Sequence, residues 1–160
     1  MKYECDCIKR WNQSHREKIV IIQIGINDLT AIAFLPEHTE KIVKIVKQNI
    51  FNLLKRLREE KIHVYIMTII PPSESTGLWT IFWTSKTDQA VAVINQFIKK
   101  LGDTQITVVD VAKQLTNNGK LESEYSLDTL HMNNKGYKVL NDIFNTSLND
   151  KNSETMDGSR

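Results

Sequence analysis

The sequence predicts an α/β fold built on a parallel sheet. Three apolar, β-branched runs have no polar face, as is typical of strands buried on both faces, and they stand at Ile19–Ile24, Ile62–Ile70 and Ile106–Val111. Longer segments with apolar residues at helical spacing separate these runs. Such an alternation predicts right-handed crossovers that place helices on the two faces of the sheet.

The first run leads into a turn at the edge of the sheet where ligands bind. Ile19–Ile24 is interrupted only by Gln23, so we expect a fully buried strand. Gly25-Ile26-Asn27-Asp28 then turns the chain, with residues that tolerate a left-handed backbone or bond to their own backbone. In an open parallel sheet, ligands bind at the carboxyl ends of the strands. Taken alone, however, a strand followed by an ordinary turn would have the same pattern.

Helical periodicity predicts the connecting segments. A long amphipathic helix is expected from Pro36 to Glu60, with its lysines on a solvated face, and a further helix over Lys86–Leu101. The last helix follows Asn133, which could cap it. It is expected to end near Leu148, so residues 1–148 form one domain and the polar residues 149–160 a disordered tail.

Composition excludes several classes of partner. The 160 residues are 41% hydrophobic and 25% charged, with a net charge of +2, too small to predict binding to nucleic acid or an anionic membrane. No apolar run approaches the roughly 18–20 residues that span a bilayer, and the N-terminus has no signal-peptide core. Cys5 and Cys7 are interpreted as reduced thiols rather than a disulfide or a zinc site. As it stands, the chain is expected in the cytoplasm.

A second motif, Asp128-Thr129-Leu130-His131, precedes the last helix. With the G-x-N-D motif that starts at Gly25, this D-x-x-H motif resembles the SGNH (GDSL-type) hydrolases, and the resemblance runs from about residue 8 to residue 148. It implies a flavodoxin-like, three-layer parallel sheet and hydrolysis of a small-molecule carboxylic ester without a cofactor or metal. It also implies that His131 and Asp128 belong to a Ser-His-Asp triad, and that Asn27 and Gly25 form the oxyanion hole.

The sequence departs from this family at the nucleophile. The family carries its serine in a G-D-S motif upstream of G-x-N-D, and this sequence contains no G-D-S. No serine considered as a replacement follows Gly-Asp on a strand-to-helix turn; these are Ser73, Ser75, Ser85 and Ser126. We therefore expect a domain that lacks its first two strands and is inactive alone. The strand Ile19–Ile24 would then be a sheet edge without charge, bulge or proline. We expect either that copies self-associate through it or that residues 1–17 cover it.

Two other functions remain open. A non-catalytic α/β binding or interaction module would keep the pocket without the nucleophile. A flavodoxin-like nucleotide or receiver domain would need a glycine-rich phosphate loop or an acidic cluster at the strand ends, and the sequence has neither. Each candidate residue also has a structural interpretation, because Asn27 and Asp128 form turns and His131 could pack at the start of a helix.

Overall fold

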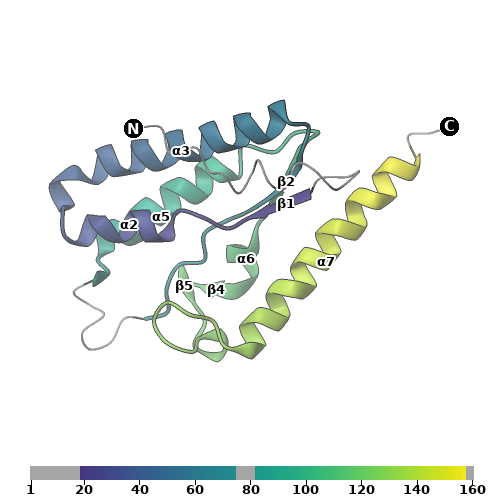
Figure 1. Cartoon of the computed structure of the whole chain (residues 1–160). Coiled ribbons are helices and arrows are strands. Elements are labelled where there is room, and N and C mark those ends of the chain that lie inside the picture. Colours follow the sequence, from purple (N-terminus) through teal and green to yellow (C-terminus); the bar gives the residue numbers. More distant parts are fainter. Residues whose placement is uncertain (1–18, 75–81, 158–160) are drawn as a thin grey trace.

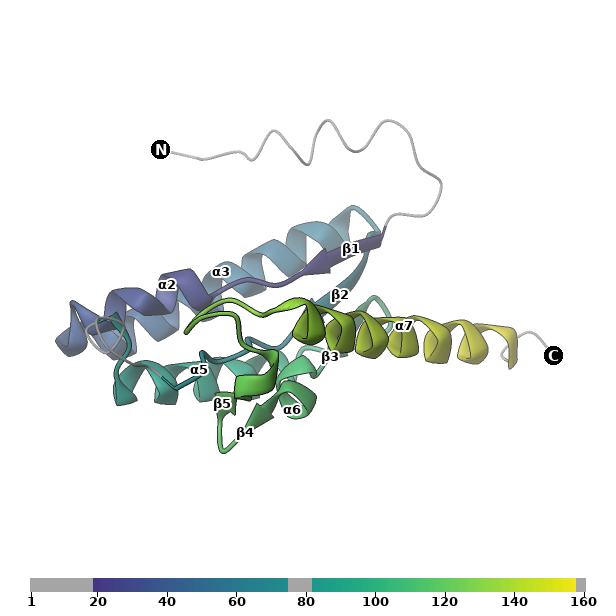
Figure 2. The same cartoon turned by 90° about the horizontal axis from the view of Figure 1, so that it is seen from below.

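The computed structural model describes residues 19–74 and 82–157. Three parallel strands form one sheet in the order β1-β2-β3, namely β1 (Ile19–Ile22), β2 (His63–Met67) and β3 (Ile106–Val109). Figure 1 labels β1 and β2, and Figure 2 labels all three strands. The parallel α/β sheet predicted from the three apolar runs is confirmed. Cys5 and Cys7, which the sequence analysis interprets as reduced thiols, and Ser75 lie outside the described residues.

Two long helices cover one face of this sheet. They are α3 (Thr39–Glu59), which a 3₁₀ turn at Pro36–His38 precedes, and α5 (Ser85–Ile98). The short helix α2 (Ile26–Thr30) packs beside them (Figure 2). The apolar faces of these helices pack against alternate residues of the strands and form a buried cluster. It includes Leu54 of α3, Ile94 of α5, and Val64 and Ile66 of β2. Burial of these apolar faces supplies the main favourable term that holds this layer to the sheet.

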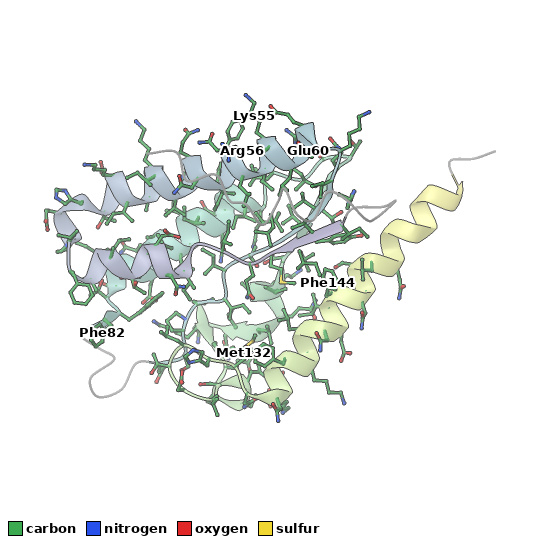
Figure 3. All side chains as sticks on the ribbon, viewed as in Figure 1. Lys55, Arg56, Glu60, Phe82, Met132 and Phe144 are labelled. Carbon is green, nitrogen blue, oxygen red and sulfur yellow. The ribbon has the colours of Figure 1, made fainter. Side chains whose placement is uncertain are left out.

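The opposite face is covered by α6 (Val111–Leu115) and α7 (Asn134–Asp157). Phe144 of α7 meets Tyr65 of β2 edge to face, with 5.3 Å between the ring centroids (Figure 3). Burial raises the pKa of the Tyr65 phenol. The three layers predicted for the domain are therefore present.

Helix α7 is longer than the sequence analysis predicted. It continues to Asp157, where a disordered tail was expected from residue 149. Residues 149–157 contain neither glycine nor proline, and Gly158 is the first residue that strongly disfavours a helix. The polar composition suggested disorder, whereas the helix started by the packed residues before 149 simply propagates through them.

The strand β1 is far more exposed than a strand buried on both faces. Ile22 is 5% exposed, but Ile19 and Ile21 are 43% and 50% exposed. Ile21 pairs with Tyr65, so both side chains lie on the face where α7 packs, yet the cluster under α7 includes no residue of β1. In the described part of the chain β1 pairs only with β2. The prediction of full burial was wrong because the helical cover on this face stops at β2.

A small hairpin links α6 to the last helix. Strands β4 (Thr116–Asn117) and β5 (Lys120–Leu121) pair antiparallel around Asn118 and Gly119, both at positive φ. Asparagine and glycine suit this turn because both tolerate a positive φ. None of the helices within residues 19–74 and 82–157 is long and apolar enough to cross a membrane.

Candidate active site

The loop between β5 and α7 holds Asp128 and His131 in one turn. One carboxylate oxygen of Asp128 accepts the backbone N–H groups of Leu130 and His131, each at 2.8 Å. The backbone N–H of Leu127 donates to the carbonyl of His131 at 2.8 Å, which closes the turn. Asp128 therefore forms the turn, as its structural interpretation predicted, and its side chain is thereby aimed at the residue three positions on.

The same carboxylate binds the imidazole of His131. Nδ1 of the ring lies 2.9 Å from Oδ1 and 2.8 Å from Oδ2 of Asp128. A carboxylate only accepts hydrogen bonds, so Nδ1 carries a proton, and in the neutral ring Nε2 is then the nitrogen with the lone pair. The His131 side chain is 65% exposed, and Nε2 makes no hydrogen bond to the residues that the structure describes. The ring is thus oriented by one nitrogen and open at the other.

Hydrogen bonds also keep Asp128 ionised. The backbone N–H of His131, followed by that of Leu130 and by the His131 ring, lowers the pKa of the Asp128 carboxyl. Each of these donors favours the charged form of the acceptor. The carboxylate is therefore negative over the pH range in which an imidazole exchanges its proton.

Asn133 fastens this loop to the last helix. Its side-chain amide nitrogen donates to the carbonyls of Glu124 at 2.9 Å and Ser126 at 3.1 Å. Its amide oxygen accepts the backbone N–H of Gly136 at 3.0 Å, so the predicted cap of the last helix is confirmed. A Cβ on Gly136 would lie 2.8 Å from the carbonyl oxygen of Tyr125, so helix and loop are in direct backbone contact.

Two serines brace the loop from the other side. The hydroxyl of Ser126 lies 2.6 Å from the carbonyl oxygen of Asp128, and that of Ser73 lies 3.3 Å from the same atom. The two hydroxyls are 3.2 Å apart. Ser73 is 8% exposed, and Ser85 is exposed at the start of α5. No serine in the described part of the chain hydrogen-bonds the ring of His131.

The G-x-N-D turn follows β1 as predicted. Gly25 is buried with φ of 108°, and a Cβ there would lie 3.0 Å from Cδ1 of Ile69, so only glycine suits the turn. Asn27 is exposed on the first turn of α2, and its carbonyl accepts the hydroxyl of Thr30 at 2.7 Å. Its side chain has no hydrogen-bond partner among the described residues.

A small crevice lies between this turn and the loop of His131. Its volume is about 190 Å³, and its lining is mostly apolar: Gln23, Ile24, Ile26, Ile69, Ile70, Leu130, His131, Met132 and Tyr137. His131 thus opens into a crevice at the carboxyl ends of β1 and β2. Gly25 and Asn27 are not among the lining residues, although they alternate along the chain with Ile24 and Ile26, which are. In the two described stretches, no three His, Cys, Asp or Glu side chains gather closely enough to hold a metal ion.

The sequence analysis missed one residue that shapes the crevice. The side-chain amide of Asn95 on α5 accepts the backbone N–H of Ile69 at 2.7 Å and donates to its carbonyl at 2.8 Å. Asn95 therefore makes the two hydrogen bonds to the backbone of Ile69 that a neighbouring strand would make if β2 continued. A polar residue directly after Ile94, on the buried side of α5, was the available signal. Gln23, the one polar residue in the run Ile19–Ile24, also lines the crevice.

Solved structures with this fold support the parallel architecture. A Bacteroides fragilis protein assigned to the acylhydrolases is 20% identical, with a TM-score of 0.65 over 83% of this chain and 62% of that chain. A GDSL-like lipase of Bacteroides thetaiotaomicron is 16% identical, with a TM-score of 0.63 over 83% and 62%. A Streptococcus pneumonia protein named for platelet activating factor is 21% identical, with a TM-score of 0.61 over 84% and 59%. The chain spans about three fifths of the length of these proteins.

The family is shown by a match to the chain itself. No curated protein matches this sequence. The model of the GDSL-like lipase/acylhydrolase family, however, matches residues 6–139, which include the turn at Gly25 and the loop with Asp128 and His131. This match covers most of the chain and agrees with the fold, so the chain belongs to the GDSL-like lipase/acylhydrolase family.

Proposed function

We propose that this domain supplies the base and the oxyanion contacts of a site that hydrolyses carboxylic esters. His131 is the general base, Asp128 orients it, and Asn27 with Gly25 forms the oxyanion side. The observation that carries the proposal is the Asp128 carboxylate on Nδ1 of His131, which leaves Nε2 free at a crevice. An imidazole held in this tautomer can take a proton from an attacking hydroxyl and later return it.

The proposed reaction proceeds through a tetrahedral intermediate. A serine hydroxyl gives its proton to Nε2 of His131 as its oxygen bonds to the ester carbon, and the carbonyl electron pair moves onto oxygen. The amide of Asn27 donates to that oxyanion, and Gly25 leaves room for its approach. The intermediate collapses, the bond to the alkoxy group breaks, and the alcohol leaves with the proton from Nε2. Water then repeats both steps on the acyl-serine, which releases the acid.

The crevice supports a small apolar group as part of the substrate. Seven of its nine lining residues are apolar or aromatic. Its volume of about 190 Å³ is below the roughly 300–1,000 Å³ of sites for drug-sized ligands. A short acyl or alkyl chain placed there would leave its ester group near His131, one of the two polar residues of the lining.

The nucleophile is proposed to come from a G-D-S segment that this sequence does not contain, so the domain alone would be inactive. Ser73 and Ser126 are bound to the carbonyl of Asp128, a backbone atom, and neither is hydrogen-bonded to the His131 ring. Removing one member of a Ser-His-Asp triad leaves only weak residual catalysis. A domain with base and oxyanion contacts but no attacking group would therefore turn over slowly.

A chimera tests the proposal. The chain is joined to the N-terminal strands and G-D-S segment of a related hydrolase, and turnover of a short-chain chromogenic ester is compared with that of the unextended chain. We expect turnover in the chimera only. His131→Ala should abolish most of it, whereas His38→Ala, which changes an exposed histidine elsewhere, should leave it intact. Asn27→Ala should lower the rate by about 10²–10³ if its amide meets the oxyanion.

Two outcomes would contradict the proposal. Strong esterase activity in the unextended chain that survives His131→Ala would place the chemistry elsewhere. A chimera that folds, as judged by circular dichroism, but stays inert would favour the non-catalytic binding module, in which the crevice binds a small molecule without attacking it.

A further inference from the structure

The outer edge of β1 is the most open apolar surface of the sheet. β1 pairs with β2 on one side, and in the described part of the chain no strand pairs with its other side. Such an edge presents a row of backbone N–H and C=O groups to solvent. Within this strand, Ile19 and Ile21 are 43% and 50% exposed. Both the backbone and the side chains of this strand are therefore available to a partner.

The other edge of the sheet shows the contrast. β3 is also an edge strand, but its Ile106 and Val109 are buried and its two middle residues are half-buried. In β1 only Ile22 is buried, and the strand has no charge or proline, which are the usual devices that discourage pairing at an edge. Of the two edges, β1 is thus the one that favours strand pairing.

We propose that a second copy of this chain occupies the β1 edge, with the two strands antiparallel around a twofold axis perpendicular to the sheet. Residues opposite each other in such a pair point to the same face. Val20 of one copy then faces Val20 of the other, and Ile19 faces Ile21 of the other copy. The strand is self-complementary, because each exposed isoleucine meets an isoleucine and no charge of β1 opposes a like charge. An isologous contact of this kind closes as a dimer.

The pairing joins two three-stranded sheets into one of six strands. It also places Ile19 and Ile21 of one copy beside those of the other on the face that α7 leaves open, so these side chains shield one another from water. The proposed pairing involves residues 19–22, whereas the crevice of His131 is lined by residues that follow the strand, from Gln23 onward. The dimer leaves this crevice unobstructed, but it occupies the edge where the resemblance places the missing N-terminal strands, so a second copy and those strands exclude each other.

Sedimentation velocity and light scattering on the full chain test this proposal. The wild-type chain should change from a dimer, at twice 18.5 kDa, to a monomer as it is diluted. Ile21→Lys places a charge opposite an isoleucine and should leave only the monomer. The matched control is Ile45→Lys on α3, which changes an isoleucine of nearly equal exposure, 48% against 50%, away from the edge. It should dimerise like the wild type.

Further measurements keep the test decisive if Ile21→Lys fails to fold. Ile19→Lys changes the other exposed isoleucine of the pair and should also weaken the dimer. Hydrogen exchange of the wild type should show amides of residues 19–22 more protected at high than at low concentration. A wild-type chain that stays monomeric, with these amides unchanged, would overturn the proposal and leave the edge to a strand of another protein. A dimer that persists in folded Ile21→Lys, or is lost in Ile45→Lys alone, would overturn it too.

Discussion

Replacing Asn95 by leucine should strongly destabilise the domain. The Asn95 amide bonds both the N–H and the carbonyl of Ile69, at 2.7 and 2.8 Å, and Ile69 is 3% exposed. Leucine has a similar size, so it would leave both backbone groups without a partner and exclude water from them. Each unsatisfied group costs about 1–3 kcal/mol, so the free energy of unfolding should fall by about 2–6 kcal/mol.

Urea unfolding followed by circular dichroism measures this loss. For a small domain the free energy of unfolding falls by about 1–3 kcal/mol per molar urea, so the midpoint should drop by on the order of 1 M or more. Gln96→Leu is the matched control, since Gln96 is the next residue of α5 and is exposed. Its free energy of unfolding should change by no more than about 0.5 kcal/mol.

An intermediate variant sharpens the result. Asn95→Asp keeps an acceptor for the N–H of Ile69 but loses the donor to its carbonyl, so its stability should lie between wild type and Asn95→Leu. If Asn95→Leu is no less stable than Gln96→Leu, the backbone of Ile69 is satisfied without the amide. The inference that α5 holds the segment after β2 in place would then be refuted.

The remaining predictions concern the two glycines and the carboxylate of the site. Gly136→Ala should lower the free energy of unfolding by about 1–3 kcal/mol, measured by thermal or urea unfolding, because its Cβ would lie 2.8 Å from the carbonyl oxygen of Tyr125. Gly25→Ala should cost on the order of 1–3 kcal/mol through its positive φ, whereas Gly102→Ala, whose Cβ would meet nothing closer than 3.6 Å, should be tolerated; equal losses in the two would contradict this. The pKa of Asp128 is lowered by folding, so its stabilising contribution is present above the unfolded value of about 4 and is lost as the pH falls through the lower folded value. The stability difference between wild type and Asp128→Asn should therefore shrink as the pH falls below about 4, and urea unfolding at several acidic pH values would detect a difference that instead grows on acidification.

The parts of the site that depend on neighbours in the chain could be predicted from the sequence. Asp128 and His131 are three positions apart, and a turn brings such residues together whatever the rest of the fold does. The cap by Asn133 and the glycine turn after β1 depend on equally short-range geometry. The G-x-N-D and D-x-x-H motifs are informative for the same reason.

The parts that depend on distant packing could not be predicted. The exposure of Ile19 and Ile21 is decided by how far the cover of α7 reaches across the sheet, and an apolar run does not contain that information. Asn95 meets a residue 26 positions earlier, and no local pattern pairs the two. The end of α7 at Asp157 was missed because the polar composition of residues 149–157 shows only that they have no apolar face to bury. A helix that has already formed continues through such residues until a helix-breaking residue ends it.

The turn that joins Asp128 to His131 orients the imidazole through contacts between residues close together in the sequence. The hydrogen bonds that orient the ring lie within residues 127–131, so the imidazole is aligned once this turn forms. Bonds from Ser73, Ser126 and Asn133 then fix the turn to the rest of the domain. A triad whose acid came from a remote strand would lose its alignment whenever that strand was exchanged. Here the turn itself holds the ring, so the orientation of His131 should persist if the loop is placed on another parallel sheet. The orientation of the His131 ring therefore depends on one short stretch of chain and not on the packing of two distant strands.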